Sequence, residues 1–243
     1  APTNYFQRPD TRYTGGFFAD YEISDSVKPY MEFMFMDDRS VAQIAPSGNF
    51  GSTLMINCDN PLISAQQASI ICDSENLING FLGTFPLTSV FNPGPAPIDF
   101  IDPTTGLTYN KAFFQPLRRN VEGGPRRADR QHTSYRTLVG TKGDINNAWS
   151  YDAYYQFGRT VYAQTYENEL SIARLTRALD VVSGPGGTPV CRSVVDGTDP
   201  NCVPYDILSG GRISDAAASY LSAVGFQRGN VDQHIGSAAL TGR

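Results

Sequence analysis

The sequence has few charged side chains, few histidines and no long apolar run. Charged residues are 18% of the 243 residues, against about 25% in an average globular domain. Acidic residues (24) outnumber basic ones (19), and a net charge of −5 argues against a nucleic-acid partner. No run approaches the roughly 18 apolar residues of a membrane-spanning helix, so we expect none. The sequence has only two histidines, His132 and His234, and contains no Cys-x-x-Cys pair. We therefore do not expect a zinc site. We expect no cofactor.

What the sequence does contain favours β-sheet. Aromatic residues reach 12%, with 13 Tyr and 14 Phe, while 23 Gly and 16 Pro supply turns. Aromatic and β-branched side chains suit the pleated surface of a strand. We therefore expect a mainly β fold of long antiparallel hairpins, arranged as a single β-rich segment over residues 1–243.

The clearest pattern is a pair of long alternating runs at 131–143 and 149–165, separated by a polar turn at 144–148. Alternation with period two is typical of a strand, so the pattern predicts an antiparallel hairpin. A run of about 17 residues far exceeds the five or six residues of an ordinary strand. Such length is typical of a membrane barrel.

A second hairpin is predicted near the N-terminus, from 13–23 and 30–37. Two further strands, at 112–122 and 230–242, are weaker, because Pro116 interrupts the first. Aromatic side chains recur on one face of the strongest strands, and we expect this face to contact lipid or another copy of the chain. Its residues are Tyr13, Phe17, Tyr21, Trp149, Tyr151, Tyr155, Phe157 and Val161.

Long connections separate the predicted strands, at about 38–111 and 167–228. Apolar spacing in the second connection predicts two short helices, at 168–182 with Asn168 as N-cap and at 214–224.

Each long connection contains a local pair of cysteines, Cys58 with Cys72 and Cys191 with Cys202. Local pairing is the simplest of three connectivities, and each bond would stabilise its loop by roughly 3 kcal/mol. Disulfides imply an oxidising compartment, whereas four free thiols in a reducing compartment are the alternative.

Several segments resemble the barrel of TonB-dependent outer-membrane receptors. They are Arg12-Tyr-Thr-Gly-Gly16, Val121-Glu-Gly-Gly-Pro-Arg126, Tyr135-Arg-Thr-Leu-Val-Gly-Thr-Lys-Gly143, Trp149-Ser-Tyr-Asp-Ala-Tyr-Tyr-Gln-Phe-Gly158 and the loop from Pro189 to Pro204. The order of strands, turns and cysteine loops carries the likeness over essentially the whole chain. The resemblance implies part of an outer-membrane β-barrel in a Gram-negative bacterium, with short turns at one end and long loops at the other. It also implies uptake of a siderophore, cobalamin or glycan fragment with TonB as partner.

The chain departs from such receptors in what it lacks. We find no N-terminal plug, about six strands where the family has roughly 22, and no aromatic residue in the final Leu240-Thr-Gly-Arg243. We therefore expect an interior piece of the barrel, without the C-terminal strand, that cannot transport alone and that would be extracellular if released.

We expect no enzyme, because no catalytic constellation is apparent. The histidines lack the surroundings of a nucleophile motif. The acidic candidates follow no acid–base motif; they are Glu22, Asp37, Asp38, Glu122 and Asp152.

Two charged segments have alternative interpretations. The basic pairs Arg118-Arg119 and Arg126-Arg127 suit a solvated loop better than lipopolysaccharide phosphates. Asp196-Gly-Thr-Asp199 suits a disulfide-closed turn better than a calcium site.

Three functions remain open from the sequence. The first is a structural β-protein that assembles with copies of itself through strand edges and the apolar face, as a filament, tube or ring. The second is part of an intact outer-membrane receptor. The third is a secreted all-β module that binds or hydrolyses glycans.

Overall fold

The computed structural model describes residues 3–78, 97–210 and 212–242, and the chain forms two compact units. The first comprises residues 1–44, 127–167 and 224–243, and the second comprises residues 45–126 and 168–223. Strand accounts for 55% of the structure and helix for 16%, so the prediction of a mainly β, antiparallel fold is confirmed. Where we expected one β-rich segment with long loops, most of the loop residues belong to a unit with its own core.

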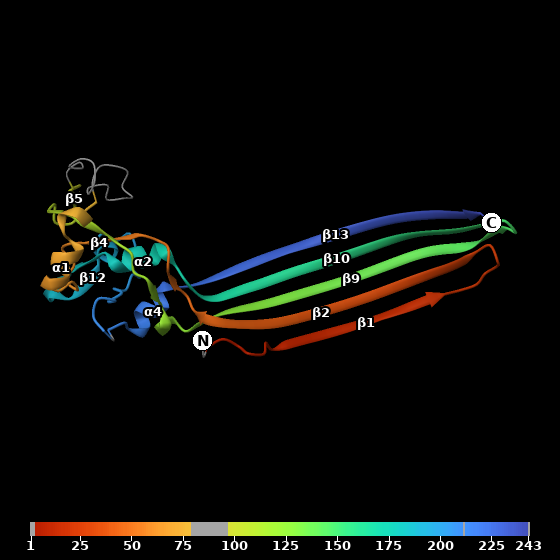
Figure 1. Cartoon of the computed structure of the whole chain (residues 1–243), viewed down its shortest axis with the longest axis horizontal. Coiled ribbons are helices and arrows are strands. Elements are labelled where there is room, and N and C mark those ends of the chain that lie inside the picture. The colour runs from red at the N-terminus through yellow and green to blue at the C-terminus, as the bar shows by residue number, and fades with distance from the viewer. Residues whose placement is uncertain (1–2, 79–96, 211, 243) are drawn as a thin grey trace. The chain divides into compact units, whose positions relative to one another are not determined.

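The first unit is a five-stranded antiparallel sheet in the order β1-β2-β9-β10-β13 (Figure 1). Its strands are β1 (Asp10–Asp20), β2 (Lys28–Pro46), β9 (Pro125–Asn146), β10 (Trp149–Leu170) and β13 (Ser222–Gly242). Because neighbouring strands alternate in direction, the two short connections lie at one end of the sheet and both long connections leave from the other. For the same reason β1 and β13, the two outer strands, run in the same direction.

Both predicted hairpins are present; β2, β9 and β10 are longer than expected, whereas β1 has the predicted length but starts and ends three residues earlier. β9 pairs with β10 over nearly their full length, and the turn between them shrinks to Asn147 and Ala148. β1 pairs with β2 from Asp10↔Ser40 to Asp20↔Tyr30. The added strand ends mix polar and apolar residues without regular alternation, as in the DDRSVAQIAP end of β2, while the strands themselves continue.

The second unit is built from short elements. Its helices are α1 (Ala65–Ile71), α2 (Ile172–Leu179), α3 (Arg192–Val195) and α4 (Asp215–Leu221), with 3₁₀ turns η1 (Ser74–Asn76), η2 (Val121–Gly123) and η3 (Pro185–Gly187). Its strands form antiparallel pairs: β3 (Gly48–Asn49) with β8 (Arg118–Arg119), β4 (Leu54–Asn57) with β7 (Lys111–Phe114), β5 (Phe100–Ile101) with β6 (Thr108–Tyr109), and β11 (Val181–Ser183) with β12 (Pro189–Cys191).

Buried apolar side chains are concentrated in the second unit. Leu175 and Leu179 of α2 pack with Leu221 of α4 and Leu54 of β4 in one cluster. Among the described residues of the first unit, only Ala42 and Leu138 are buried apolar side chains. The part of the chain that the structure describes contains no helix long and apolar enough to cross a membrane.

The two predicted helices are shorter than expected. α2 begins after Ser171, whose hydroxyl accepts a hydrogen bond from the backbone of Arg174, while Asn168 has a positive φ of 62° in β10. α4 ends at Leu221, because the next residues join the sheet as β13. Two helices that the sequence analysis did not predict, α1 and α3, also form.

The two weaker strand predictions were wrong in their bounds. The run 112–122 is divided between β7, β8 and a 3₁₀ turn, since Pro116 lies between the two strands. The run 230–242 is the second half of β13, which starts at Ser222. Its first half contains Gly225 and Gly229 and shows no apolar alternation, so the sequence pattern concealed it.

Candidate functional surface: a two-faced sheet with open edges

The strand register sorts the side chains of the sheet into two faces. Aromatic rings meet across neighbouring strands on one of them: Phe17 and Phe33 have ring centroids 5.7 Å apart, Tyr135 and Phe157 6.1 Å, and Phe157 and His234 5.0 Å. We call this the aromatic face. Its larger side chains include Tyr13, Phe17, Met31, Phe33, Phe35, Tyr135, Val139, Trp149, Tyr151, Tyr155, Phe157, Val161, Phe226 and His234.

Seven of the eight residues predicted for an apolar face therefore lie on one face of one sheet. Trp149 is at its turn end, and the exception is Tyr21. The Trp149 ring lies against Gly242, where an added Cβ would come within 3.0 Å of it. Tyr21 follows β1 in the turn and donates its backbone N–H to Pro29. The sequence analysis left out Phe33, Phe35 and Tyr135, although each alternates in step with its strand.

Charged pairs cross the aromatic face on one side of its apolar band. Arg39 donates to both oxygens of Asp129 at 3.0 and 2.5 Å, and Arg159 donates to both oxygens of Asp232 at 2.6 and 2.9 Å. Such two-pronged pairs are stronger and more directional than single ones. On the turn side of Asp37 and of the Arg159–Asp232 pair, the described strands carry no charged residue on this face; in β10 this band runs from Tyr151 to Phe157.

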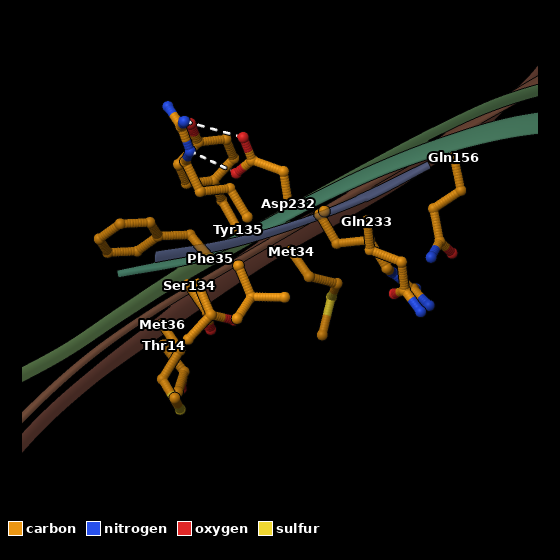
Figure 2. A pocket seen from close by; sticks show the side chains of 14 residues that line it. Thr14, Met34, Phe35, Met36, Ser134, Tyr135, Gln156, Asp232 and Gln233 are labelled. Carbon is orange, nitrogen blue, oxygen red and sulfur yellow. Dashed lines mark hydrogen bonds and ion pairs between the residues drawn. The ribbon is translucent and has the colours of Figure 1, made fainter. Parts of the chain in front are cut away.

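The opposite face is mainly polar. Figure 2 shows Phe35, Tyr135 and Asp232 on one side of the ribbon and Met34, Gln156 and Gln233 on the other. These side chains border a shallow hollow of about 750 Å³ that spans all five strands. On the polar face, cross-strand pairs tie the strands together: Glu32–Arg136 at 2.8 Å, Tyr30–Asp152 at 2.6 Å and Arg12–Asp38 at 2.6 Å.

Both outer strands are exposed. All eleven residues of β1 are exposed, as are most residues of β13. Each is paired on one side only within the described part of the chain, with β2 and β10 respectively. The outer edges therefore present unpaired backbone N–H and C=O groups to any further strand.

The candidate acids are dispersed, and each has its own donor. Asp37 accepts from Thr133 on the aromatic face, whereas Asp38 accepts from Arg12 on the polar face. In the second unit, Arg118 forms an ion pair with Glu122. The remaining pairs are Glu22 with Lys28 and Asp152 with Tyr30.

The other candidate residues also have local partners. The His132 ring lies 4.8 Å from that of Tyr162, and the His234 Nδ1 is 2.6 Å from the Tyr155 hydroxyl. Arg119 donates to the Pro46 carbonyl. The two remaining basic residues form looser pairs, Arg126 with Glu169 and Arg127 with Glu167.

The Asp196–Asp199 segment is a turn inside the second disulfide. Asp196 accepts from Thr198, Gly197 has a φ of 76°, and Asp199 accepts from Arg177 and Tyr220. The structure groups no three potential metal ligands within its described ranges.

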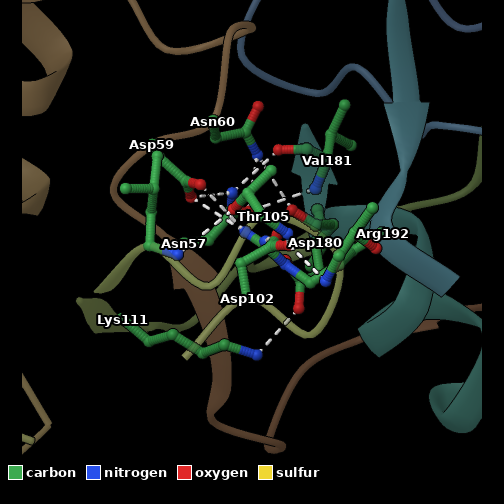
Figure 3. A network of polar contacts seen from close by, with 12 residues as sticks. Asn57, Asp59, Asn60, Asp102, Thr105, Lys111, Asp180, Val181 and Arg192 are labelled. Carbon is green, nitrogen blue, oxygen red and sulfur yellow. Dashed lines mark hydrogen bonds and ion pairs between the residues drawn. The ribbon is translucent and has the colours of Figure 1, made fainter. Parts of the chain in front are cut away.

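The second unit is organised around Arg192, which the sequence analysis did not single out (Figure 3). The guanidinium is buried and donates to Asp180 at 3.0 Å, to both oxygens of Asp59 at 3.0 Å, and to Asp102. Its planar group also lies 3.8 Å from the centre of the Tyr109 ring. One arginine thus connects its own segment and Asp180 with two segments that lie more than 80 residues away in the sequence.

Both disulfides adjoin this network. Cys58 bonds to Cys72 and Cys191 to Cys202. Cys58 is next to Asp59 and Cys191 is next to Arg192, so the covalent and ionic links hold the same segments. The signal that could have identified Arg192 is its position beside a cysteine, in a unit rich in aspartate.

Electrostatics favours the charged forms of two acids of this unit, Asp102 and Glu122. Burial alone would raise the pKa of Asp102, but the backbone N–H groups of Thr105 and Thr104 and the charge of Arg192 lower it below the usual value. Arg118 lowers the pKa of Glu122 in the same way, through a direct hydrogen bond.

We found no family model, curated protein or solved structure that matches this chain significantly. The resemblance to TonB-dependent receptors therefore stays a hypothesis that rests on the residues themselves.

Proposed function

We propose that this chain is a structural β-protein whose sheet is continued by further strands at its two edges. The observation that carries the proposal is the exposure of β1 and β13 along their lengths. Unpaired edges of this length are templates for β-pairing, and most proteins shorten, charge or cover them. Here the last eight residues of β13, Ile235–Gly242, contain no charged residue.

The aromatic face supports the same proposal. Tyr13 is 65% exposed, Phe17 49% and Tyr155 53%, on a face shared by all five strands. A continuous apolar patch of this kind normally marks an interaction surface. Copies of the chain joined at their edges would form a continuous wall, and covering its aromatic face would remove that apolar area from water.

The test is the state of association of the full chain in aqueous buffer. We expect light scattering and negative-stain images to show oligomers, rings or filaments that grow with concentration. A Val231→Lys variant, with a charge on the β13 edge, should shift the equilibrium toward monomer. Val195→Lys, at an exposed valine of the second unit, is the matched control. A stable monomer at all concentrations without detergent would contradict the proposal.

A second function is favoured by the band between the charged pairs and the turns. In β10 the band with its flanking tryptophan spans Trp149–Phe157, close to the 9–11 residues with which a tilted strand crosses hydrocarbon. The sheet would then be a wall segment of an outer-membrane receptor, completed by other strands of that receptor.

The single tryptophan, Trp149, distinguishes the two functions. After reconstitution with lipid vesicles, its fluorescence should be quenched by brominated acyl chains if the band lies in a bilayer. Quenching by aqueous acrylamide alone would place the tryptophan in water and leave the structural assembly as the function.

A further inference from the structure

We infer that β13 is the site of self-association, and that it pairs antiparallel with β13 of a second copy across a two-fold axis at Asn230. This inference rests on the proposed function and names the partner and register of one of its two edges.

The direction of the strands selects the partner. β1 and β13 are parallel to each other, because an odd number of antiparallel strands separates the two edges. A second copy added by translation would set its β1 parallel to β13 in an otherwise antiparallel sheet. A two-fold axis instead sets β13 against β13 antiparallel, which keeps the hydrogen-bond pattern of the sheet, and two-fold dimers are the commonest assemblies.

Continuity of the aromatic face restricts the register. Even-numbered residues of β13 lie on that face, as His234 and Asp232 show by their contacts with Phe157 and Arg159. Residues directly opposite each other in a sheet share a face. Only registers that set even residues opposite even residues therefore join two aromatic faces into one.

Charge selects one of these registers. Full overlap of the two strands would set Asp232 opposite Asp232 of the second copy, which is repulsive. Moving the axis to Asn230 sets Arg228 opposite Asp232 of the second copy, twice in the dimer. Arg228 is exposed and has no carboxylate partner in the described part of the chain, and the Asp232 side chain keeps 34% of its surface exposed beside Arg159.

Side-chain size fits the same register. On the polar face, Gly225 lies opposite Ile235 of the second copy, and Gly229 lies opposite Val231. Each β-branched side chain thus faces a glycine and has room to pack. On the aromatic face, Phe226, which is 80% exposed, lies opposite His234 of the second copy and forms an aromatic pair.

β1 offers a shorter match. Full overlap of β1 with itself sets Asp10 opposite Asp20 of the second copy, twice, and like charges directly opposite are destabilising. A shifted register sets Arg12 opposite Asp20, but it pairs only residues 12–20, against residues 222–238 in β13, and Arg12 already pairs with Asp38. β1 also has 11 residues, against 21 in β13.

The first test places a thiol on the proposed axis. All four native cysteines are in disulfides, so Asn230→Cys adds the single free thiol of the chain. Mild oxidation or a short bis-maleimide should link two full-length chains. Val224→Cys, on the same face of the same strand, lies opposite Gly236 of the second copy and should not link to itself. Equal cross-linking of both variants would overturn the register.

The second test uses charge reversal. Arg228→Asp alone and Asp232→Arg alone each set like charges opposite each other twice, so each should self-associate about tenfold more weakly. An equimolar mixture of the two variants restores opposite charges and should associate as well as the unaltered chain. Circular dichroism checks that each variant still forms the sheet.

The outcomes separate this inference from the proposed function. If the chain associates but neither the thiol nor the charge variants respond, the register inferred for β13 is wrong and edge association stands. If the unaltered chain stays monomeric at every concentration, both fail.

Discussion

The two units of this chain are stabilised by different kinds of interaction. The second unit buries Leu175, Leu179 and Leu221 almost completely and adds two disulfides and a buried arginine. The first unit has long hydrogen-bonded strands but exposes both faces of its outer strands. Sheets normally cover one face or close on themselves. The second unit is therefore packed around a core of its own, whereas the outer strands of the first unit stay exposed, which is the surface that our proposal assigns to self-association.

The largest expected effect is the loss of the arginine at the centre of the second unit. Arg192→Met leaves Asp59, Asp102 and Asp180 without their shared partner. Removing one member of a buried ionic group typically costs about 3–5 kcal/mol. We expect hydrogen exchange to lose its protection in the second unit, while amides of β9 and β10 stay protected. Arg212→Met, at an exposed arginine of the same unit, is the control. An equal loss of protection in both units would show that they unfold together, and it would contradict the view that each unit is stabilised separately.

The next largest loss of stability is expected when a disulfide is removed. Replacing Cys191 and Cys202 by alanine opens a loop with a sequence separation of 11. The chain-entropy model gives a loss of roughly 3 kcal/mol. The paired replacement of Cys58 and Cys72, with a separation of 14, should cost a similar amount. Chemical denaturation monitored by exchange in the second unit measures both. A loss confined to β9 and β10 would contradict the assignment of these bonds to the second unit.

The same contrast explains which elements the sequence could predict. The hairpins β1–β2 and β9–β10 follow from alternating side chains, a local signal that the sheet keeps. The first half of β13 and the short strands of the second unit do not alternate, because their place depends on pairing with distant segments. Local cysteine spacing identified both disulfides.

The aromatic face was partly predictable and the arginine network was not. Tyr13, Phe17, Tyr155 and Phe157 could be grouped because each strand carries its own alternation. Arg192 meets Asp59 and Asp102 across more than 80 residues of sequence, and no local pattern specifies such a contact.

A smaller effect is expected from acid. The pKa values of Asp102 and Glu122 are held below their ordinary values of 3.8 and 4.5 in the folded second unit. The unfolded chain therefore binds protons first, and the stability that these groups contribute is full above their unfolded values. It is lost as pH falls through the folded values. We expect the second unit to unfold at a lower temperature at pH 3 than at pH 6.

The control for this pH dependence is Glu122→Gln, which removes one titrating group without changing the shape of the side chain. The variant should lose less stability between pH 6 and pH 3 than the unaltered chain. A second unit that gains stability on acidification would contradict the direction of these pKa shifts.

The smallest effect is expected at an exposed aromatic residue of the first unit. Phe226 is 80% exposed, whereas Leu179 in the second unit is 2% exposed. In a dilute, dispersed chain, Phe226→Ala should change the free energy of unfolding by no more than about 0.5 kcal/mol. Leu179→Ala should cost about 2–5 kcal/mol, because it leaves a cavity.

Concentration makes this pair of variants informative. If β13 pairs with a second copy, Phe226 is covered in the assembly, and the cost of Phe226→Ala should rise with protein concentration. The cost of Leu179→Ala should stay constant, because its surroundings belong to one chain. Denaturation curves at two concentrations at least a hundredfold apart measure both. A Phe226→Ala cost that is already large in the dilute chain would mean that β13 is covered within the monomer, and the first unit would then be as complete as the second.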